Sequence, residues 1–290
     1  MNKPMPASPL TMESPLVRRL LIAFACLHIG LLVILPFASV FWQACCHGMA
    51  TFTNLLASRD TRAAISLTLQ ITAIVIPVNC LFGVLLAWGL THVRIPGKRF
   101  ILTLLDLPFS VSPVVVGLLF ILLFGSNGYM GNFLKSHHIK IIFAFPGLLL
   151  VTLFVTMPFV IKELVPLMGD KDNGQEEAAR LLGGSWWRIF WKITFPDIKW
   201  GLLYGIILCT ARAIGEFGAV AVVSGSIRGR TNTLPLHIEA LFQDGDLPAA
   251  SAAASLLALL GIVSLIARCI ADNIRKRAEE QRRGISQPLQ

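Results

Sequence analysis

Long runs of apolar residues alternate with short polar connections along this chain. A transmembrane helix needs about 20 residues, because it rises roughly 1.5 Å per residue through about 30 Å of hydrocarbon. Six runs meet this length: Leu20–Phe41, Ile65–Leu90, Phe100–Phe124, Ile141–Ile161, Gly201–Val223 and Pro248–Ile270. The strict alternation of a membrane barrel is missing from them, and backbone groups in lipid must be hydrogen-bonded within the protein. The pattern therefore predicts an all-α, polytopic membrane protein with six helices.

The composition agrees with this prediction. Hydrophobic residues make up 55% of the chain, charged residues 14%, and the mean hydropathy is +0.71. Soluble domains carry about 25% charged residues. We expect one membrane domain over residues 20–270, tails at 1–19 and 271–290, and a polar loop at 171–197 between the fourth and fifth spans. The first run is longer than a signal-peptide core of about 7–15 residues, so it is expected to remain as a helix.

The distribution of cations predicts the orientation. Of the 25 lysines and arginines, 18 fall on the side of the two tails and the 171–197 loop, and Arg212 lies inside a span. The other side holds six: Arg59, Arg62, Lys135, Lys140, Arg228 and Arg230. By the positive-inside rule, both termini and the loop are expected in the cytoplasm. The net charge of +9 is consistent with contact with membrane lipid. No nucleic-acid partner is expected, because no basic patch is interleaved with stacking aromatics.

The sequence predicts no metal, cofactor or catalytic site. Free cysteine behaves as a small apolar residue within a span, and four of the six cysteines fall there: Cys26, Cys80, Cys209 and Cys269. Cys45 and Cys46 are adjacent, so a bridge between them would be strained. His137 and His138 have no cysteine or carboxylate at metal-ligand spacing, which favours a solvated loop.

The 171–197 loop reads as two short helices. Asn173 and Glu176 form a capping-box pattern at the start of the first helix, and Gly183 with Gly184 ends it. Its apolar face carries Ala178, Leu181 and Leu182. The second helix is expected to begin at Ser185, to carry Trp186, Trp187, Phe190 and Trp191, and to stop at Pro196. Such a hairpin either rests on lipid headgroups or docks a soluble partner.

The spacing within this loop resembles the EAA signature of permease subunits of ABC importers, E-A-A-x3-G-x9-I-x-L-P. The matching residues are Glu177, Ala178, Ala179, Gly183, Ile193 and Pro196, and Phe195 replaces the leucine. The resemblance implies that these residues couple the permease to an ATP-binding subunit. No G-x4-G-K-[ST] motif occurs in the chain, so the ATPase is expected on another polypeptide.

Other segments are similar to the sulfate/thiosulfate permeases, and most to their W-type subunit. They are LLDLPFSVSPVVVGL, FGSNGYMG, KELVPLM and ARAIGEFGAVAVVSGSIRG, and the similarity runs from about Leu32 to Ile270. Molybdate permeases share the R-A-x-G-E-F-G-A core, whereas SGSIRG and GSNG favour sulfate; Arg230 stands where this family suggests Glu. The resemblance implies a location in the inner membrane of a bacterium. It also implies an assembly of two permeases, expected to be a heterodimer, an ATP-binding subunit dimer and a periplasmic sulfate/thiosulfate-binding protein.

Arg212 and Glu216 are the candidate centre of a translocation path. They lie four residues apart in the fifth predicted span and can pair on one helix face. A charge at mid-membrane costs about 2.5 to 3.5 kcal/mol, so both side chains should face the bundle interior or water. The pair either fixes helix packing or takes part in a gate. Ser112, Ser224 and Arg228, near the outer ends of the third and fifth spans, are the other candidates, although ordinary loop composition also explains them.

The predicted function is therefore a non-catalytic permease that works by alternating access. A molybdate or tungstate importer subunit of the same architecture is the nearest alternative. A secondary anion transporter would need unpaired acids within the spans, to which only Asp106 and Glu216 come close. A membrane enzyme is disfavoured, because no Ser/His/Asp or His/Glu constellation recurs at the span ends.

Overall fold

The computed structural model describes residues 15–46, 48–93, 95–169 and 174–285, and these residues form helices and connecting turns with no strand. Four helical segments of this part are each long and apolar enough to cross a membrane: Leu16–Cys46, Arg59–His92, Phe145–Gly169 and Leu247–Ile274. Two further apolar segments are each bent at a break, so the number of spans is six if each bent pair counts as one. The all-α, polytopic prediction is confirmed, but the third and fifth predicted spans are not continuous helices.

The helix bounds differ from the hydropathy bounds mainly in length. The observed helices are α1 (Pro15–Ile29), the π-helix η1 (Gly30–Ile34), α2 (Leu35–Cys46), α3 (Gly48–Ala57), α4 (Arg59–His92), α5 (Lys98–Leu104), α6 (Leu107–Ser110), α7 (Pro113–Phe124), α8 (Gly131–Ser136), α9 (Phe145–Gly169), α10 (Gly174–Leu181), α11 (Trp186–Ile189), the π-helix η2 (Phe190–Thr194), α12 (Phe195–Ile214), α13 (Gly218–Ser224), α14 (Leu234–Gln243) and α15 (Leu247–Ile285). The fourth span begins at Phe145 instead of Ile141, and the sixth continues beyond Ile270. Hydropathy misses the end of the sixth span because polar turns of a helix continue outside the apolar layer, and it extends the fourth because residues 141–144 are apolar without being helical.

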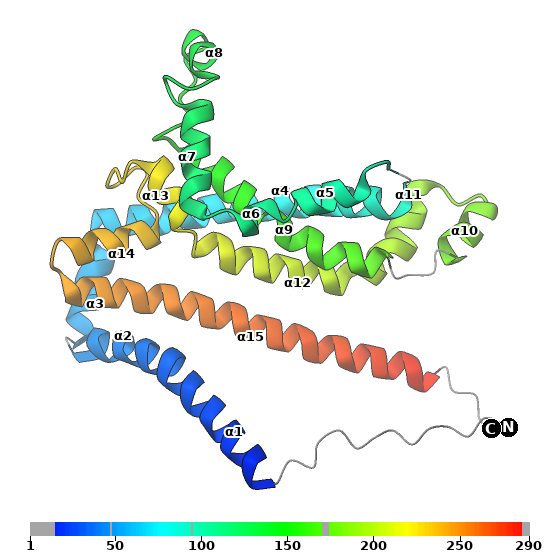
Figure 1. Cartoon of the computed structure of the whole chain (residues 1–290), viewed down its shortest axis with the longest axis horizontal. Coiled ribbons are helices and arrows are strands. Elements are labelled where there is room, and N and C mark those ends of the chain that lie inside the picture. The colour runs from blue at the N-terminus through cyan, green and yellow to red at the C-terminus, as the bar shows by residue number, and fades with distance from the viewer. Residues whose placement is uncertain (1–14, 47, 94, 170–173, 286–290) are drawn as a thin grey trace.

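The predicted span Phe100–Phe124 is broken at Val111 and Ser112. Lys98–Ser110 and Pro113–Phe124 meet at 106°, so α7 turns out of the bundle and carries α8 away from it (Figure 1). Both residues of the break have extended ψ angles, of 137° and 134°. Pro113 causes this, because a proline ring pushes the preceding residue out of the helical region and offers no N–H.

The predicted span Gly201–Val223 is also broken, and its other end is longer than expected. The α12 and α13 segments meet at 49°, whereas α11, η2 and α12 form one helical run over Trp186–Ile214. The prediction that Pro196 stops the short helix is wrong. Pro196 lies in the first turn of α12, and the Phe195 N–H bonds to the Phe190 carbonyl across the wider π-turn. A proline is tolerated there because the π-turn has already shifted the hydrogen-bond register.

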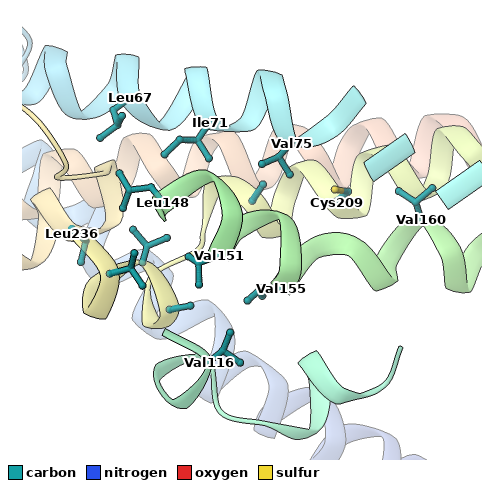
Figure 2. Close-up of a cluster of buried hydrophobic side chains, with 14 of the residues drawn as sticks. Leu67, Ile71, Val75, Val116, Leu148, Val151, Val155, Val160, Cys209 and Leu236 are labelled. Carbon is teal, nitrogen blue, oxygen red and sulfur yellow. The ribbon is translucent and has the colours of Figure 1, made fainter. Parts of the chain in front are cut away.

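Helices α4, α9 and α12 form the centre of the bundle, and α15 runs beside α12 (Figure 1). Figure 2 shows Leu67, Ile71 and Val75 on one face of α4, with Leu148 and Val151 of α9 within the same cluster. The four-residue spacing on α4 places these side chains on one helix face. Two ends of the bundle can be named by their short helices: α10 and α11 lie at the α10 end, and α3 and α14 lie at the α14 end (Figure 1).

Small residues set the distance between the three central helices. A Cβ atom built on Gly83 of α4 would lie 2.6 Å from Cγ1 of Val160 on α9. A Cβ atom on Gly205 of α12 would lie 3.0 Å from the Val160 Cα atom. Lipid gives apolar helices little hydrophobic reason to associate, so close packing through glycines is a principal source of affinity between them. The backbones of α4 and α12 therefore both approach α9 closely at Val160.

This contact predicts the effect of enlarging either glycine. Gly205→Leu should lower the free energy of unfolding by about 1–3 kcal/mol, because the added atoms meet backbone that cannot rotate away. Gly89→Ala on α4 is the matched control: no atom lies within 4 Å of its added Cβ. It should be neutral or stabilising by up to about 1 kcal/mol. Thermal unfolding in detergent, followed by tryptophan fluorescence, measures both; equal melting temperatures for the two variants would contradict the packing account.

Candidate functional site

The motif residues at the α10 end form a helix, a tight turn and a second helix. The predicted N-cap, Asn173, lies outside the described residues. At the other end of α10, the Gly183 N–H bonds to the Arg180 carbonyl and the Gly184 N–H bonds to the Ala179 carbonyl, each at 2.9 Å. These two bonds form a Schellman motif, in which the first residue after the helix adopts a left-handed conformation. Gly183 does so, with a φ angle of 78°, and the prediction that Gly183 and Gly184 end the helix is confirmed.

This turn explains the spacing between the E-A-A triplet and the glycine. Ala179 supplies the carbonyl that closes the turn, and Gly183, four residues later, supplies the left-handed backbone. No atom lies within 4 Å of a Cβ built on Gly183, so the position needs glycine for its backbone angle and not for lack of space. A Cβ on Gly184 would lie 2.8 Å from the Ala179 oxygen.

The second half of the motif joins this turn to the fifth span. Ser185 occupies the N-cap position of α11, although its side chain accepts no capping hydrogen bond. Ile193 lies in η2 and Pro196 in the first turn of α12. Because α11, η2 and α12 are one helical run, the turn at Gly183 is attached to the span by helix and not by flexible chain.

One face of α10 carries large apolar side chains that nothing in the described chain covers. Leu181 and Leu182 are 89% and 88% exposed, and Ala178 and Glu177 beside them are exposed as well. The predicted shared face of Ala178, Leu181 and Leu182 is therefore an open surface. Exposed apolar patches with polar rims are typical of protein interaction sites.

Glu176, next to the motif glutamate, has a role that the sequence did not predict. It was expected to complete a capping box, but its side chain is buried and turned into the bundle. One carboxylate oxygen accepts from the Thr194 hydroxyl at 2.7 Å, and the other accepts from Nε2 of His92 at 3.1 Å. His92 is 84 residues away in the last turn of α4, so no local pattern could have indicated this contact.

Arg212 and Glu216 pair across the break in the fifth span. Nη1 of Arg212 lies 2.5 Å from Oε2 of Glu216, which confirms that the two side chains pair. Glu216 lies beyond the end of α12, not on a continuous helix, and its Oε1 accepts from the Ala219 N–H at 3.0 Å. The Glu216 side chain is 1% exposed and that of Arg212 31%. One buried carboxylate thus caps α13 and holds the arginine at the end of α12.

The breaks of the two bent spans lie against each other. A Cβ on Gly218 would lie 3.0 Å from Cβ of Pro113, and one on Gly117 would lie 2.7 Å from the Ala219 oxygen. Beside this contact is a cavity of about 10 Å³ with four polar lining residues: Thr68, Thr152, Glu216 and Thr233. The Thr233 hydroxyl is buried without a hydrogen-bond partner. A cavity of this size holds about one water molecule.

The remaining path candidates lie on either side of this contact. Ser112 is exposed and directly precedes Pro113, so it lies beside the start of α13. Ser224 is fully buried: its hydroxyl donates to the Thr231 carbonyl, the Thr231 hydroxyl donates back to the Ser224 carbonyl, and both bonds are 2.7 Å long. Arg228 is exposed and binds both carboxylate oxygens of Asp244, at 2.8 and 2.6 Å.

Asp106, the other acid considered for an ion-coupled mechanism, is also paired. Its carboxylate contacts the ammonium group of Lys162, which lies 4.3 Å from the centre of the Phe109 ring. Both acids that a gradient-driven transporter could have used are therefore neutralised by a neighbouring cation.

Comparison with known proteins agrees with these features. Residues 79–279 match the family model described as "Binding-protein-dependent transport system inner membrane component". The sulfate transport system permease protein CysW of Escherichia coli K12 is 47% identical over 265 residues, which cover 90% of this chain and 91% of CysW. Sulfate permease 2 of the Chlamydomonas reinhardtii chloroplast is 46% identical, over 92% of this chain and 72% of its own. CysT of the same E. coli strain is 34% identical, over 83% and 90%.

A solved structure shows the same fold. The structure of a bacterial ABC transporter that imports the polysaccharide alginate contains a chain that superposes with a TM-score of 0.73. The match covers 90% of this chain and 96% of that one at 17% identity. The helical, multi-pass architecture, the family match over most of the chain and the identity to CysW agree: this chain is an inner membrane protein of the binding-protein-dependent transport system permease family.

Proposed function

We propose that this chain is one of the two permease subunits of an ATP-driven sulfate or thiosulfate importer. It forms part of the translocation path and carries out no covalent chemistry itself. The observation that carries this proposal is that the exposed helix α10 joins, through the tight turn at Gly183, a continuous helical run from α11 to α12, and that the Arg212–Glu216 pair lies at the other end of this run. The three relatives compared above are all named as sulfate permeases, which favours sulfate over molybdate or tungstate.

The proposed partners are an ATP-binding subunit dimer, a second permease and a periplasmic sulfate/thiosulfate-binding protein. The same E. coli strain has CysW and CysT, two different sulfate permeases that both match this chain, which supports a heterodimer. A second solved structure, with a TM-score of 0.74, is an alginate ABC transporter in complex with a periplasmic protein. The apolar window of the first span is 0% buried within this chain, so lipid or a second subunit must cover it.

In the proposed orientation both termini and the α10 end are cytoplasmic, as the distribution of cations predicts. The uncovered face of α10, with Leu181 and Leu182, then meets the ATP-binding subunit. The α14 end, with the outer loop of Ser224 and Arg228, faces the periplasm and the binding protein. The salt bridge of Arg228 to Asp244 supports a role in shaping this outer surface more than direct anion capture.

The proposed mechanism is alternating access driven by closure of the ATPase dimer. Closure displaces α10 and its exposed face. Because the turn at Gly183 is continuous with α11, η2 and α12, the displacement moves α12 and changes the break at which Arg212 and Glu216 pair. Ser112, at the opposing break in the third span, faces the same region and is a second polar contact for the anion.

The docking face can be tested without disturbing the fold. Leu181→Asp places a charge at a side chain that is 89% exposed, so insertion into the membrane should be unchanged. Co-purification with the ATP-binding subunit and uptake of radiolabelled sulfate should both fall at least about tenfold, which corresponds to roughly 1.4 kcal/mol. Gln175→Ala, an exposed position on the same helix, is the matched control. A Leu181→Asp permease that binds its ATPase and transports normally would refute the docking proposal.

Two substitutions at Gly183 distinguish the effect of backbone geometry on transport from the effect of surface chemistry. Gly183→Asn should keep transport near the wild-type level, because asparagine tolerates a left-handed conformation. Gly183→Val should lose most transport, because a β-branched residue at positive φ costs of order 1–2 kcal/mol and unwinds the turn. Uptake assays, with membrane insertion measured in parallel, check both. The backbone explanation fails if the two variants are equally active or equally inactive.

The Arg212–Glu216 pair can be tested by removing its charges one at a time. Arg212→Met should destabilise the protein by about 3–5 kcal/mol, because it leaves a buried carboxylate unpaired. Arg212→Met combined with Glu216→Gln should recover folding, since glutamine can still accept from the Ala219 N–H. We expect the double variant to assemble and yet not transport. Normal uptake by the double variant would instead show that the pair only fixes helix packing.

A further inference from the structure

We propose that a cluster of three side chains joins α10 and α11, here called the coupling loop, to α4. The cluster consists of Glu176, His92 and Thr194 and is called the Glu176 cluster below. Through it, ATP-driven movement reaches the second span as well as the fifth. Glu176 is then a positioning residue for coupling, distinct from the motif glutamate beside it. This inference rests on the proposed function, because it assumes that α10 docks on an ATP-binding subunit.

The two adjacent acids of α10 lie on different sides of the helix, one buried and one exposed. Successive residues of a helix are about 100° apart around its axis. Glu177 is exposed beside the uncovered leucines, whereas Glu176 is only 8% exposed and lies against the bundle. Glu177 is thus placed for the soluble partner and Glu176 for the permease itself.

The contacts of Glu176 reach two different segments. Its Oε1 accepts from Thr194 in η2, and its Oε2 accepts from Nε2 of His92 at the end of α4. A carboxylate can only accept, so the proton of the second bond is carried by His92. Charge-assisted bonds of this kind are shorter and stronger than neutral ones. A single side chain therefore ties α10 to both the fifth and the second span.

His92 is itself held in place by its neighbours on α4 and by α11. Its Nδ1 lies 2.9 Å from the Thr91 hydroxyl and 3.2 Å from the Trp88 carbonyl. Its ring stacks on that of Trp88, with 5.3 Å between centroids, and Trp88 meets Trp186 edge to face at 5.9 Å. The end of α4 therefore contacts α10 through His92 and α11 through Trp88. The His92 ring is held so that its Nε2 atom points at Glu176.

The Glu176 cluster matters because α10 is too short to be stable or rigid alone. Isolated helices of fewer than about 12–15 residues are marginal in water, and α10 has eight. Without Glu176 the chain would still connect α10 to α12 through the Gly183 turn. The hydrogen bond that joins α10 to α4 would be lost, and the ring contact of Trp88 with Trp186 would remain beside it.

Movement of α4 reaches the break in the fifth span by a route separate from α12. Thr68, on the distant half of α4, accepts from the Leu234 N–H at 2.8 Å and lines the same small cavity as Glu216. The helix that passes beside Glu216 at Thr68 thus ends at His92. Coupling through α4 would act on the pair from one side while α12 acts on it from the other.

The experiment compares the two neighbouring acids in the complete importer, reconstituted in lipid vesicles with its own ATP-binding subunits and binding protein. Three quantities are measured: co-purification of the ATPase, ATP hydrolysis, and sulfate taken up per ATP hydrolysed. Glu176→Ala should keep the first two and lower sulfate uptake per ATP by about tenfold, within the range of ordinary coupling energies. Glu177→Gln should instead weaken co-purification, and Gln175→Ala should change nothing.

A second pair of variants protects the test against misfolding of the Glu176 variant. His92→Gln retains an N–H donor and should preserve most of the uptake per ATP, whereas His92→Leu should lower it as Glu176→Ala does. The inference is overturned if uptake and hydrolysis fall together with loss of the ATPase, or if uptake per ATP is unchanged in both Glu176→Ala and His92→Leu. A wild-type chain that binds no ATP-binding subunit would overturn the proposed function, and with it this inference.

Discussion

The structure depends on one constraint: a backbone that leaves the helical conformation inside an apolar bundle must have its polar groups satisfied by the protein. Both bent spans leave that conformation midway. At the break in the fifth span, the Gly215 and Glu216 N–H groups bond to carbonyls of α12, and the Glu216 carboxylate accepts from the Ala219 N–H and pairs with Arg212. The break in the third span is packed directly against it through Pro113 and Gly218. Irregular backbone is tolerated in membrane proteins where it is buried or lines a path. At these breaks Glu216 is buried, whereas Ser112 and Gly215 are exposed within this chain and are placed to line a path.

The need to satisfy backbone hydrogen-bonding groups also explains the motif at the α10 end of the bundle. The helix of the E-A-A triplet would end with unpaired carbonyls, and the Schellman turn at Gly183 and Gly184 satisfies two of them within six residues. The π-helix η2 then joins α11 to α12, whose first turn contains Pro196, without a break in the helix. The spacing that is a family signature in the sequence corresponds, in the structure, to a tight turn followed by a continuous helix. Together they join an exposed surface to a span.

The sequence predicts what depends on composition or on local spacing. Six apolar runs indicate the spans, and an i,i+4 pair of opposite charges indicates the contact of Arg212 with Glu216. The pattern could not show the 106° bend, because Pro108 and Pro113 are compatible with a kink, and the ψ angle of Ser112 decides between kink and break. It could not show the partner of Glu176 either, because the contact with His92 depends on how α4 and the loop pack in three dimensions. The contact of Glu176 was missed because it is tertiary, whereas the break at Ser112 and the passage of the helix through Pro196 were missed because they depend on local backbone angles.

The position of the glycine contacts at Val160 affects how the bundle could move. Gly83, Val160 and Gly205 bring three backbones together at a level between the Glu176 cluster and the break. Helices that touch through glycine can tilt about the contact with less rearrangement of side chains than helices with interlocked large residues. An inward push on α4 and α12 at the α10 end would then separate their far halves, where Thr68 and Glu216 line the small cavity. Opening on one side and closing on the other is what alternating access requires, and it follows from a pivot of small residues placed off the centre of the span.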